Sequence, residues 1–298
     1  MSSTSFVKVD RKTHNQLRQA IVKSLNLIQY RLPSELGNVV IKPNMCYYWD
    51  HSTGLTTDPE FVSALIDVLR NQISQDLNIS IVESDASAMK CKHSFKLLGY
   101  ERMAEKCDVR LVNLSEDKGE KVEVWINKQC FSFILPQTVR NADLRINVPK
   151  IKYATHTKIS CALKNIFGCN PNPAKFKYHS ILDETIVALN KIMKFDLHIL
   201  DGIIVAGTRP HRLGLVMTSQ DPVALDAAVA KLTGINPKSI RHITLAHKER
   251  LGNISFIPKG DSPKIFGNRF PRKKLKDKVL SSAYRLAIWT GLLDAEML

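Results

Sequence analysis

The stretch NVVIKPNMCYYWDHSTGLTTDPEFVSALIDVLRNQISQDLNISIVES, residues 38–84, decides the fold class of this chain. The β-branched runs at residues 38–44 and 79–84 have the length and composition of buried strands. Between them, residues 57–73 carry the pattern of a helix. A strand, a helix and a second strand in this order predict one unit of a parallel α/β sheet.

Two of the expected helices have clear start signals. In the first helix, either Thr57 or Asp58 is the expected N-cap, and Pro59 suits the first helical position. In a later helix, Asp221 is the expected N-cap and Pro222 lies in the first turn. These signals predict where both helices begin.

The same alternation continues along the chain. Further strands are expected at residues 109–114, 144–150, 197–205 and 213–219, and further helices at residues 94–106, 182–194 and 221–234. Residues 121–135 differ, because two short strand-like runs flank the polar turn NKQC and predict a hairpin. We therefore predict an α/β fold with a mostly parallel, Rossmann-like open sheet, helices on both faces and one inserted β-hairpin.

The composition changes near the C-terminus. From residue 258 the chain is basic and rich in Pro and Gly, and a run with helical apolar spacing follows. We predict an α/β body over residues 1–257, as one unit or as two subdomains divided near residues 115–140. Residues 258–298 are predicted to be a basic linker and a C-terminal amphipathic helix.

The net charge of +15 is the strongest signal in the composition. It suits three kinds of partner: nucleic acid, an anionic membrane surface or a small acidic molecule. No apolar run approaches the ~20 residues that a membrane span requires, and the first residues are polar, unlike a signal peptide. We therefore expect a cytoplasmic protein without a membrane partner.

The cysteines and glycines argue against several cofactors. The six cysteines contain no C-x-x-C pair, so neither a disulfide framework nor a cysteine-ligated iron–sulfur cluster is expected. No G-x-G-x-x-G or G-x-x-x-x-G-K-[ST] fingerprint for a nucleotide is present. No metal is expected either, because the histidines lack H-x-x-x-H and H-E-x-x-H spacing. The identity of any cofactor stays open.

Polar side chains gather where several of the expected strands end. They are Lys42 with Asn44, Glu83 with Asp85, Lys150 with Lys152, and Asp201 with Gly202. In open α/β sheets, ligands bind beyond the carboxyl ends of the strands. These residues are therefore expected to share a binding site.

The segment NVPKIKYATHTKISCALKNIFG, residues 147–168, adds further candidates. It has the pattern of a strand end, a polar crossing loop and a helix. Lys164 and Asn165 lie among apolar residues of this helix, where a lysine must reach solvent, pair with an acid or hold a ligand. His156 is a candidate acid–base group, because its ordinary pKa is ~6.5. With His179 it would supply half of a metal site.

Several motifs taken together resemble the family called domain of unknown function 362. The matching motifs are KPN at 42–44, PKIK at 149–152, LKN at 163–165, DG at 201–202 and DPVALDA at 221–227, and the resemblance extends from Lys42 to about Asn253. The family's reaction is not settled, and many members are labelled iron–sulfur proteins because some carry a ferredoxin-like cysteine module. This chain is similar to a short member without that module. It also departs from the family pattern in the spacing of its histidine, since YAT separates Lys152 from His156.

We favour an enzyme of open reaction class that binds a small anionic substrate, a carboxylate or a phosphate. The expected catalytic residues are Lys150, Lys152, His156 and Glu83, with Lys or His moving a proton. The expected substrate-binding residues are Lys42, Asn44, Asp85, Lys164, Asn165, Asp201 and Gly202.

Two other functions stay open. A nucleic-acid-binding protein would use the basic surface and tail, especially residues 269–278. An accessory redox protein would work with an iron–sulfur partner, as the family resemblance implies. Association into a homo-oligomer also stays open.

Overall fold

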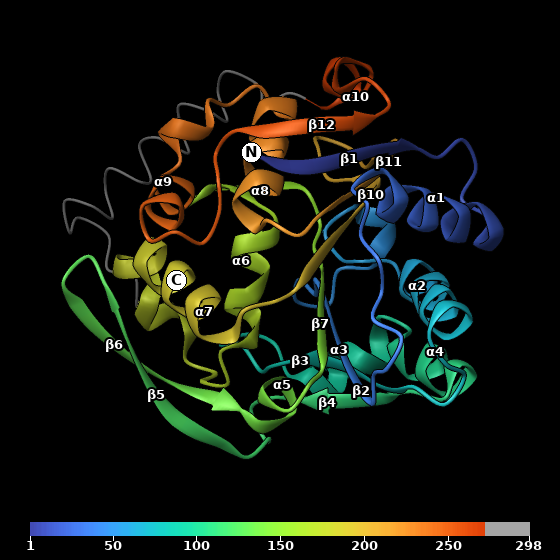
Figure 1. Ribbon diagram of the computed structural model, residues 1–298. Coiled ribbons are helices and arrows are strands. Elements are labelled where there is room, and N and C mark those ends of the chain that lie inside the picture. The colour runs from blue at the N-terminus through green and yellow to red at the C-terminus, as the bar shows by residue number, and fades with distance from the viewer. Residues whose placement is uncertain (272–298) are drawn as a thin grey trace.

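The computed structural model of the protein describes residues 1–271. Its centre is an eight-stranded sheet in the order β12-β1-β11-β10-β7-β2-β3-β4 (Figure 1). The strands are β1 (Ser2–Lys8), β2 (Asn38–Pro43), β3 (Asn78–Glu83), β4 (Arg110–Asn113), β7 (Leu144–Val148), β10 (Leu197–Val205), β11 (His211–Ser219) and β12 (Phe256–Gly260). Neighbouring strands pair in parallel except at β11, which is antiparallel to both β10 and β1. The predicted mostly parallel α/β sheet is confirmed.

Helices cover both faces of the sheet (Figure 1). One face is covered by α1 (His14–Leu27), α2 (Pro59–Gln72), α3 (Cys91–Leu97) and α4 (Tyr100–Cys107). The other is covered by α6 (Ala162–Ile166), α7 (Leu182–Met193), α8 (Pro222–Leu232) and α9 (Arg241–Lys248). Shorter elements are α5 (Gln137–Arg140), α10 (Pro263–Arg269) and the 3-10 turns η1 (His51–Thr53), η2 (Phe167–Cys169), η3 (Lys175–Ile181) and η4 (Pro237–Ser239).

The alternation of side chains along the strands divides the interior into two apolar cores. In β2, Val39 and Ile41 pack in the core under α1 and α2, whereas Val40 packs in the core under α7 and α8. Both sets are almost fully buried. A continuous Val/Ile run is what a strand covered on both faces requires, because each face then needs apolar side chains.

The helix starts follow the predicted signals. Asp58 caps α2 by accepting a hydrogen bond from Glu60 N at 3.0 Å, and Asp221 caps α8 by accepting one from Ala224 N at 2.9 Å. Thr57, the alternative cap, instead donates its hydroxyl to Val148 O at 2.9 Å. Each cap satisfies an amide that the first helical turn leaves without a partner.

A hairpin of β5 (Gly119–Ile126) and β6 (Gln129–Pro136) forms a separate two-stranded sheet, as expected. Its turn residues Asn127 and Lys128 both have positive φ, at 46° and 67°. Two consecutive positive φ values are typical of a tight hairpin turn. Phe131 and Phe133 of this hairpin pack in the core that α7 covers.

One expected helix and one expected loop differ from the structure. The helix expected over residues 94–106 is divided into α3 and α4 at Gly99, whose φ is 81°. The polar crossing loop after β7 forms a small hairpin, β8 (Lys152–Ala154) with β9 (Lys158–Ser160), before the five-residue helix α6. Lys158 has a φ of 65°, a value that its residue type does not indicate in advance.

The expected boundary at residues 257/258 falls inside β12. This strand pairs in parallel with β1, so that Ser2 lies opposite Phe256. In and after α10, Phe266 and Phe270 are buried in the core. The first part of the expected linker thus completes the sheet, whereas the rest of the basic stretch and the expected C-terminal helix lie outside the described residues. Among residues 1–271, none of the helices has the length and apolar character needed to cross a membrane.

Candidate functional site

A cavity of about 250 Å³ lies beside the carboxyl ends of β2 and β3. Its walls come from the loops that follow these two strands, from β8 and β9, and from the segment that runs from α6 through η2 to η3. This is the edge of an open α/β sheet where ligands bind. The cavity is therefore the candidate functional site.

The cavity is strongly cationic. Among residues 1–271, four lysines line it, Lys42, Lys152, Lys164 and Lys175, and Glu83 is the one acid in the lining. Six of the eleven residues expected at the site lie in this lining: Lys42, Asn44, Glu83, Lys152, Lys164 and Asn165. Lys152 and Lys164, from the segment at residues 147–168, thus line the same cavity as Lys42.

Lys42 and Glu83 form a buried ion pair at the floor of the cavity. Lys42 Nζ lies 2.7 Å from Glu83 Oε2 and also donates to Pro43 O at 2.7 Å. Both side chains are almost fully buried, with exposures of 1% and 3%. Gly168 lies directly above the pair, where an added Cβ would be 3.0 Å from Lys42 Nζ. Because Glu83 pairs with Lys42, the other three lysines of the lining have no ion pair with a carboxylate of the lining.

Lys175 also lines the cavity, although the sequence pattern does not predict it as a site residue. Its Nζ donates to Ser84 Oγ at 2.6 Å and to Gly168 O at 3.4 Å. Burial lowers the pKa of Lys175, and the Glu83 carboxylate opposes that shift. Its partners in these bonds are neutral oxygens, so its positive charge is not cancelled.

Lys152 and Lys164 stand near each other on β8 and α6. Lys152 Nζ donates to Leu55 O at 3.0 Å, whereas Lys164 Nζ has no hydrogen-bond or ion-pair partner among residues 1–271. Burial lowers the pKa of Lys152. Burial and the charge of Lys152 together lower the pKa of Lys164 to about 8. Lys164 is thus a partly buried cation that forms no ion pair with an acid among residues 1–271.

Two histidine rings meet beside these lysines. The ring of His156 lies against that of His179, with centroids 4.5 Å apart, and His179 lines the cavity. Burial, with the charges of His156 and Lys164, lowers the pKa of His179 to about 4. His179 is therefore neutral at pH 7 and a weaker base than an exposed histidine. Within residues 1–271, no group of three or more His, Cys, Asp or Glu side chains is placed to hold a metal.

The two asparagines of the lining hold the walls in place. Asn44 Nδ2 donates to Leu55 O at 2.8 Å. Asn165 Nδ2 donates to Asn147 Oδ1 at 2.7 Å and to Lys42 O at 3.2 Å, which ties α6 to the strands β2 and β7. These bonds fix the distance between the helix that carries Lys164 and the floor that carries Lys42.

Lys150 and Asp201 lie outside the cavity lining and pair with each other. Their Nζ and Oδ2 atoms are 3.1 Å apart, and both side chains are 1% exposed. Lys150 also donates to Ile204 O at 2.7 Å, and Asp201 accepts from Asp58 N at 3.0 Å. This pair joins β10 to the start of α2.

Asp85 and Gly202 also lie outside the lining. Asp85 accepts from Cys91 N at 2.9 Å and from Lys90 Nζ at 2.8 Å, so it holds the start of α3. A Cβ on Gly202 would lie 2.8 Å from Leu215 O, so this glycine permits the close approach of β11. Both residues support elements around the site.

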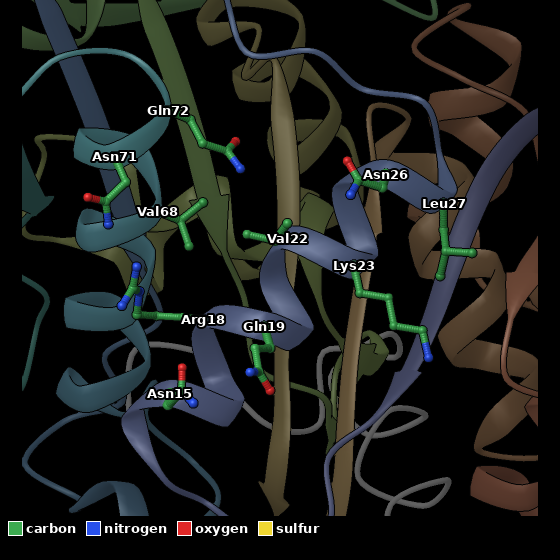
Figure 2. A pocket seen from close by; sticks show the side chains of 10 residues that line it. All are labelled: Asn15, Arg18, Gln19, Val22, Lys23, Asn26, Leu27, Val68, Asn71 and Gln72. Carbon is green, nitrogen blue, oxygen red and sulfur yellow. The ribbon is translucent and has the colours of Figure 1, made fainter.

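A second cavity, of about 580 Å³, is larger but chemically plainer. Figure 2 shows that the residues lining it come from α1 and α2; half of them are amides, and Arg18 and Lys23 are the charged members. It lies between two helices, away from the strand ends, and the described part of the chain contributes no acid or histidine to its lining. We therefore place the functional site in the smaller cavity.

Several lining residues were not named from the sequence, among them Cys46, Tyr47, Lys175 and Phe176. Cys46 and Tyr47 follow the KPN motif directly and could have been found as part of the same strand-end loop. Lys175 and Phe176 follow a loop rich in Pro and Asn, where no periodic pattern predicts the direction of a side chain.

The sequence of the chain matches a known protein family and is similar to that of a described protein. The model of the family described as domain of unknown function (DUF362) matches residues 39–231. A thylakoid-associated protein of Synechocystis is 27% identical over 229 residues, which are 72% of this chain and 68% of that protein.

Two solved structures are similar to the chain to different degrees. The lactate racemase apoprotein from Thermoanaerobacterium thermosaccharolyticum superposes with a TM-score of 0.50 at 11% identity, over 79% of this chain. A protein from Thermotoga maritima gives a TM-score of 0.41 at 11% identity, over 81% of this chain. The chain spans 58% and 60% of the lengths of these two chains. At this identity the likeness to the racemase concerns the α/β fold alone.

Proposed function

The chain belongs to the family described as domain of unknown function (DUF362), and we propose that it binds a small anion in its lysine-lined cavity and acts on it as an enzyme. The proposed ligand is a carboxylate or a phosphate. The observation that carries the proposal is the charge of the lining, where four lysines face one carboxylate and Lys164 has no partner among residues 1–271.

Electrostatics supports this choice of ligand. An ammonium group that is removed from water loses hydration energy, which an opposite charge or hydrogen bonds must restore. Glu83 provides an opposite charge for Lys42 but for none of the other three lysines as a close pair. An anion between Lys152, Lys164 and Lys175 would supply the negative charge that these three lysines lack. Removing water from the cavity would strengthen each of these contacts.

The histidine pair supports acid–base chemistry at the same place. His179 is neutral at pH 7, because its pKa is about 4, and it lies within the electrostatic reach of Lys164. We propose that His179 and His156 move a proton while the lysines stabilise negative charge on the ligand. In this proposal Glu83 fixes Lys42, and Lys150 with Asp201 supports the sheet behind the site.

Calorimetric titration with inorganic phosphate and with acetate at pH 7 tests the proposal. Lys164→Met and Lys152→Met are each expected to weaken binding about tenfold or more, because a charge-assisted contact contributes roughly 1.5–3 kcal/mol.

Lys177→Met is the matched control for these variants. It removes the same charge from an exposed residue two positions from Lys175, so affinity is expected to stay unchanged. Wild-type affinity in folded Lys164→Met protein would reject the proposed site.

We also propose that the protein works in the cytoplasm. All six cysteines are free, as is usual in a reducing compartment. The thylakoid association of the Synechocystis relative makes the membrane fraction the alternative to test. Sedimentation of the protein with membranes after a high-salt wash of lysed cells would contradict a cytoplasmic location.

A further inference from the structure

The position of the Lys164 amine is set by the backbone of a rigidly held helix. Asp226, on α8, accepts a hydrogen bond from Ala162 N at 2.7 Å at the start of α6. Asn190, on α7, donates to Leu163 O at 2.8 Å, and Asn165 is tied to Asn147. Three neighbouring elements thus hold the short helix from which Lys164 enters the cavity.

The groups that face this amine come from four different elements. They are Lys152 from β8, Cys46 from the loop after β2, His179 from η3 and Asp183 from α7. None of them forms a hydrogen bond or an ion pair with Lys164 Nζ. The positive charge of Lys152 disfavours protonation of Lys164 Nζ. With a pKa of about 8, roughly a tenth of the Lys164 side chains are uncharged at pH 7. An exposed lysine has a free-amine fraction at least a hundredfold smaller.

A free amine beside a cationic pocket suits a particular reaction. Lysines made nucleophilic by burial or by a second cation form imines with carbonyl compounds. A carbonyl carbon next to a carboxylate would place the carboxylate on the neighbouring lysines while its carbonyl meets the amine. Met45, Met89 and Phe176 line other walls of the cavity and would contact a small apolar side chain. A volume of about 250 Å³ accommodates a small acid of this kind.

We propose that Lys164 forms an imine with a small 2-oxo acid whose carboxylate is held by Lys152 and Lys175. The lone pair of Lys164 Nζ attacks the carbonyl carbon, and a C–N bond forms as one of the two amine protons passes to the carbonyl oxygen, which becomes a hydroxyl group. His179 accepts the second amine proton and gives it to the hydroxyl, which leaves as water as the C–O bond breaks and the C=N bond forms. The products are the imine and one molecule of water. This inference rests on the proposed anion site and adds a substrate class to it.

Reductive trapping tests the imine directly. Full-length protein is incubated with pyruvate and sodium cyanoborohydride, digested, and mapped by mass spectrometry. The expected result is one reduced pyruvate adduct per chain, located at Lys164, with labelling suppressed by excess inorganic phosphate. Labelling should rise about tenfold per pH unit between pH 6 and pH 7 and level off near pH 8.

Two variants separate the imine from anion binding. Lys164→Arg keeps a positive charge but has no nucleophilic amine, so it should retain phosphate binding and lose the adduct completely. Lys177→Arg, an exposed matched control, should leave the Lys164 adduct unchanged. Circular dichroism establishes that each variant is folded. The peptide map of the wild-type protein decides the question without any variant.

The outcomes are distinguishable. Phosphate binding without an adduct at Lys164, or labelling of exposed lysines such as Lys177 to the same extent as Lys164, would overturn the imine while the proposed anion site stands. A wild-type protein that binds neither phosphate nor acetate and gives no adduct would overturn both.

Discussion

At the scale of single residues, Lys150 and Asp201 form a buried ion pair in which each charge depends on the other. Removing one member leaves the other charge buried, which costs about 3–5 kcal/mol in comparable cases. Asp201→Asn is therefore expected to lower the free energy of unfolding by that amount, measured by urea denaturation. Phosphate affinity of the folded fraction should be unchanged, because neither residue lines the cavity.

The exposed pair of Lys8 and Asp10 is the matched control for this change. Its side chains are 43% and 72% exposed, so water screens the pair and Asp10→Asn should change the free energy of unfolding far less than Asp201→Asn does. Equal losses for the two substitutions would contradict the structural role of the Lys150–Asp201 pair.

Lys164 is expected to lower stability at neutral pH. Its folded pKa of about 8 lies below its ordinary value of 10.5, so protonation favours the unfolded chain. Lys164→Met keeps the apolar stem and removes the charge. At pH 7 it should raise the free energy of unfolding by on the order of 1–3 kcal/mol.

The sign of this effect depends on pH. Between pH 8 and pH 10.5 the unfolded chain binds more protons at this residue, so the wild-type protein gains stability as pH rises. The advantage of Lys164→Met should therefore shrink across this window, as urea titrations at several pH values would measure. An advantage that stays constant from pH 7 to pH 10 would contradict the lowered pKa.

The candidate site was predictable only in part at this scale. Lys150 and Lys152 are two positions apart and would share one face of a continuous strand. The chain instead leaves the sheet after Val148 and starts a new hairpin at Lys152, so the two lysines enter different surroundings. The sequence does predict three residues of the site. Lys42 and Glu83 lie at the ends of strands, and Lys164 interrupts an apolar run.

At the scale of elements, the turn η2 fits closely over the floor of the cavity. A Cβ at Gly168 would lie 3.0 Å from Lys42 Nζ and 3.1 Å from Glu83 Oε1, so the ion pair must shift to admit it. Gly168→Ala should therefore cost about 1–3 kcal/mol of stability and weaken phosphate binding severalfold. Calorimetry on folded protein measures the second effect.

Gly267→Ala is the control for this substitution. The nearest heavy atom to its added Cβ is 3.8 Å away, and alanine favours a helix over glycine by up to ~1 kcal/mol. It should leave binding unchanged and stability equal or higher. If Gly168→Ala and Gly267→Ala had the same effects on stability and binding, the turn η2 would be able to move without disturbing the Lys42–Glu83 ion pair. That outcome would contradict this prediction.

The elements themselves were predictable where local chemistry determines them. Asp58 and Asp221 cap helices whose interiors have a clear apolar pattern, so their starts follow from neighbouring residues alone. The β8–β9 hairpin depends on a positive φ at Lys158, and the break between α3 and α4 depends on Gly99. Such conformations are selected by packing around the segment, which local propensity does not contain.

At the scale of the whole molecule, the segment after residue 255 belongs to the sheet. A chain that ends at residue 255 would lose β12 and expose the pocket for Phe266 and Phe270, which are 0% and 3% exposed. Burial of two such side chains contributes about 3–6 kcal/mol, so this truncation should unfold at markedly lower urea concentration. A chain that ends at residue 271 retains all of these contacts and should keep phosphate binding. Equal stability of the two truncations would contradict the place of β12 in the fold.

The general arrangement of strands and helices was predictable, but the edge of the sheet was not. Val/Ile runs separated by helices predict parallel strands wherever they occur. Residues 256–260, FIPKG, contain Pro and Gly and have no strand pattern of their own, so their pairing with β1 follows only from the assembled molecule.

The pairing of β1 also orders events during translation. Val7 pairs with Val216 and Ser2 with Phe256, so the first strand to leave the ribosome receives its two neighbours only near the end of synthesis. Contacts this distant along the chain form slowly, because a long loop must close first. We therefore expect β1 to stay unpaired while β2, β3 and β4 assemble, and its joining to β11 and β12 to be a late step of folding. A ribosome that stalls before residue 256 releases a polypeptide whose sheet lacks its last strand.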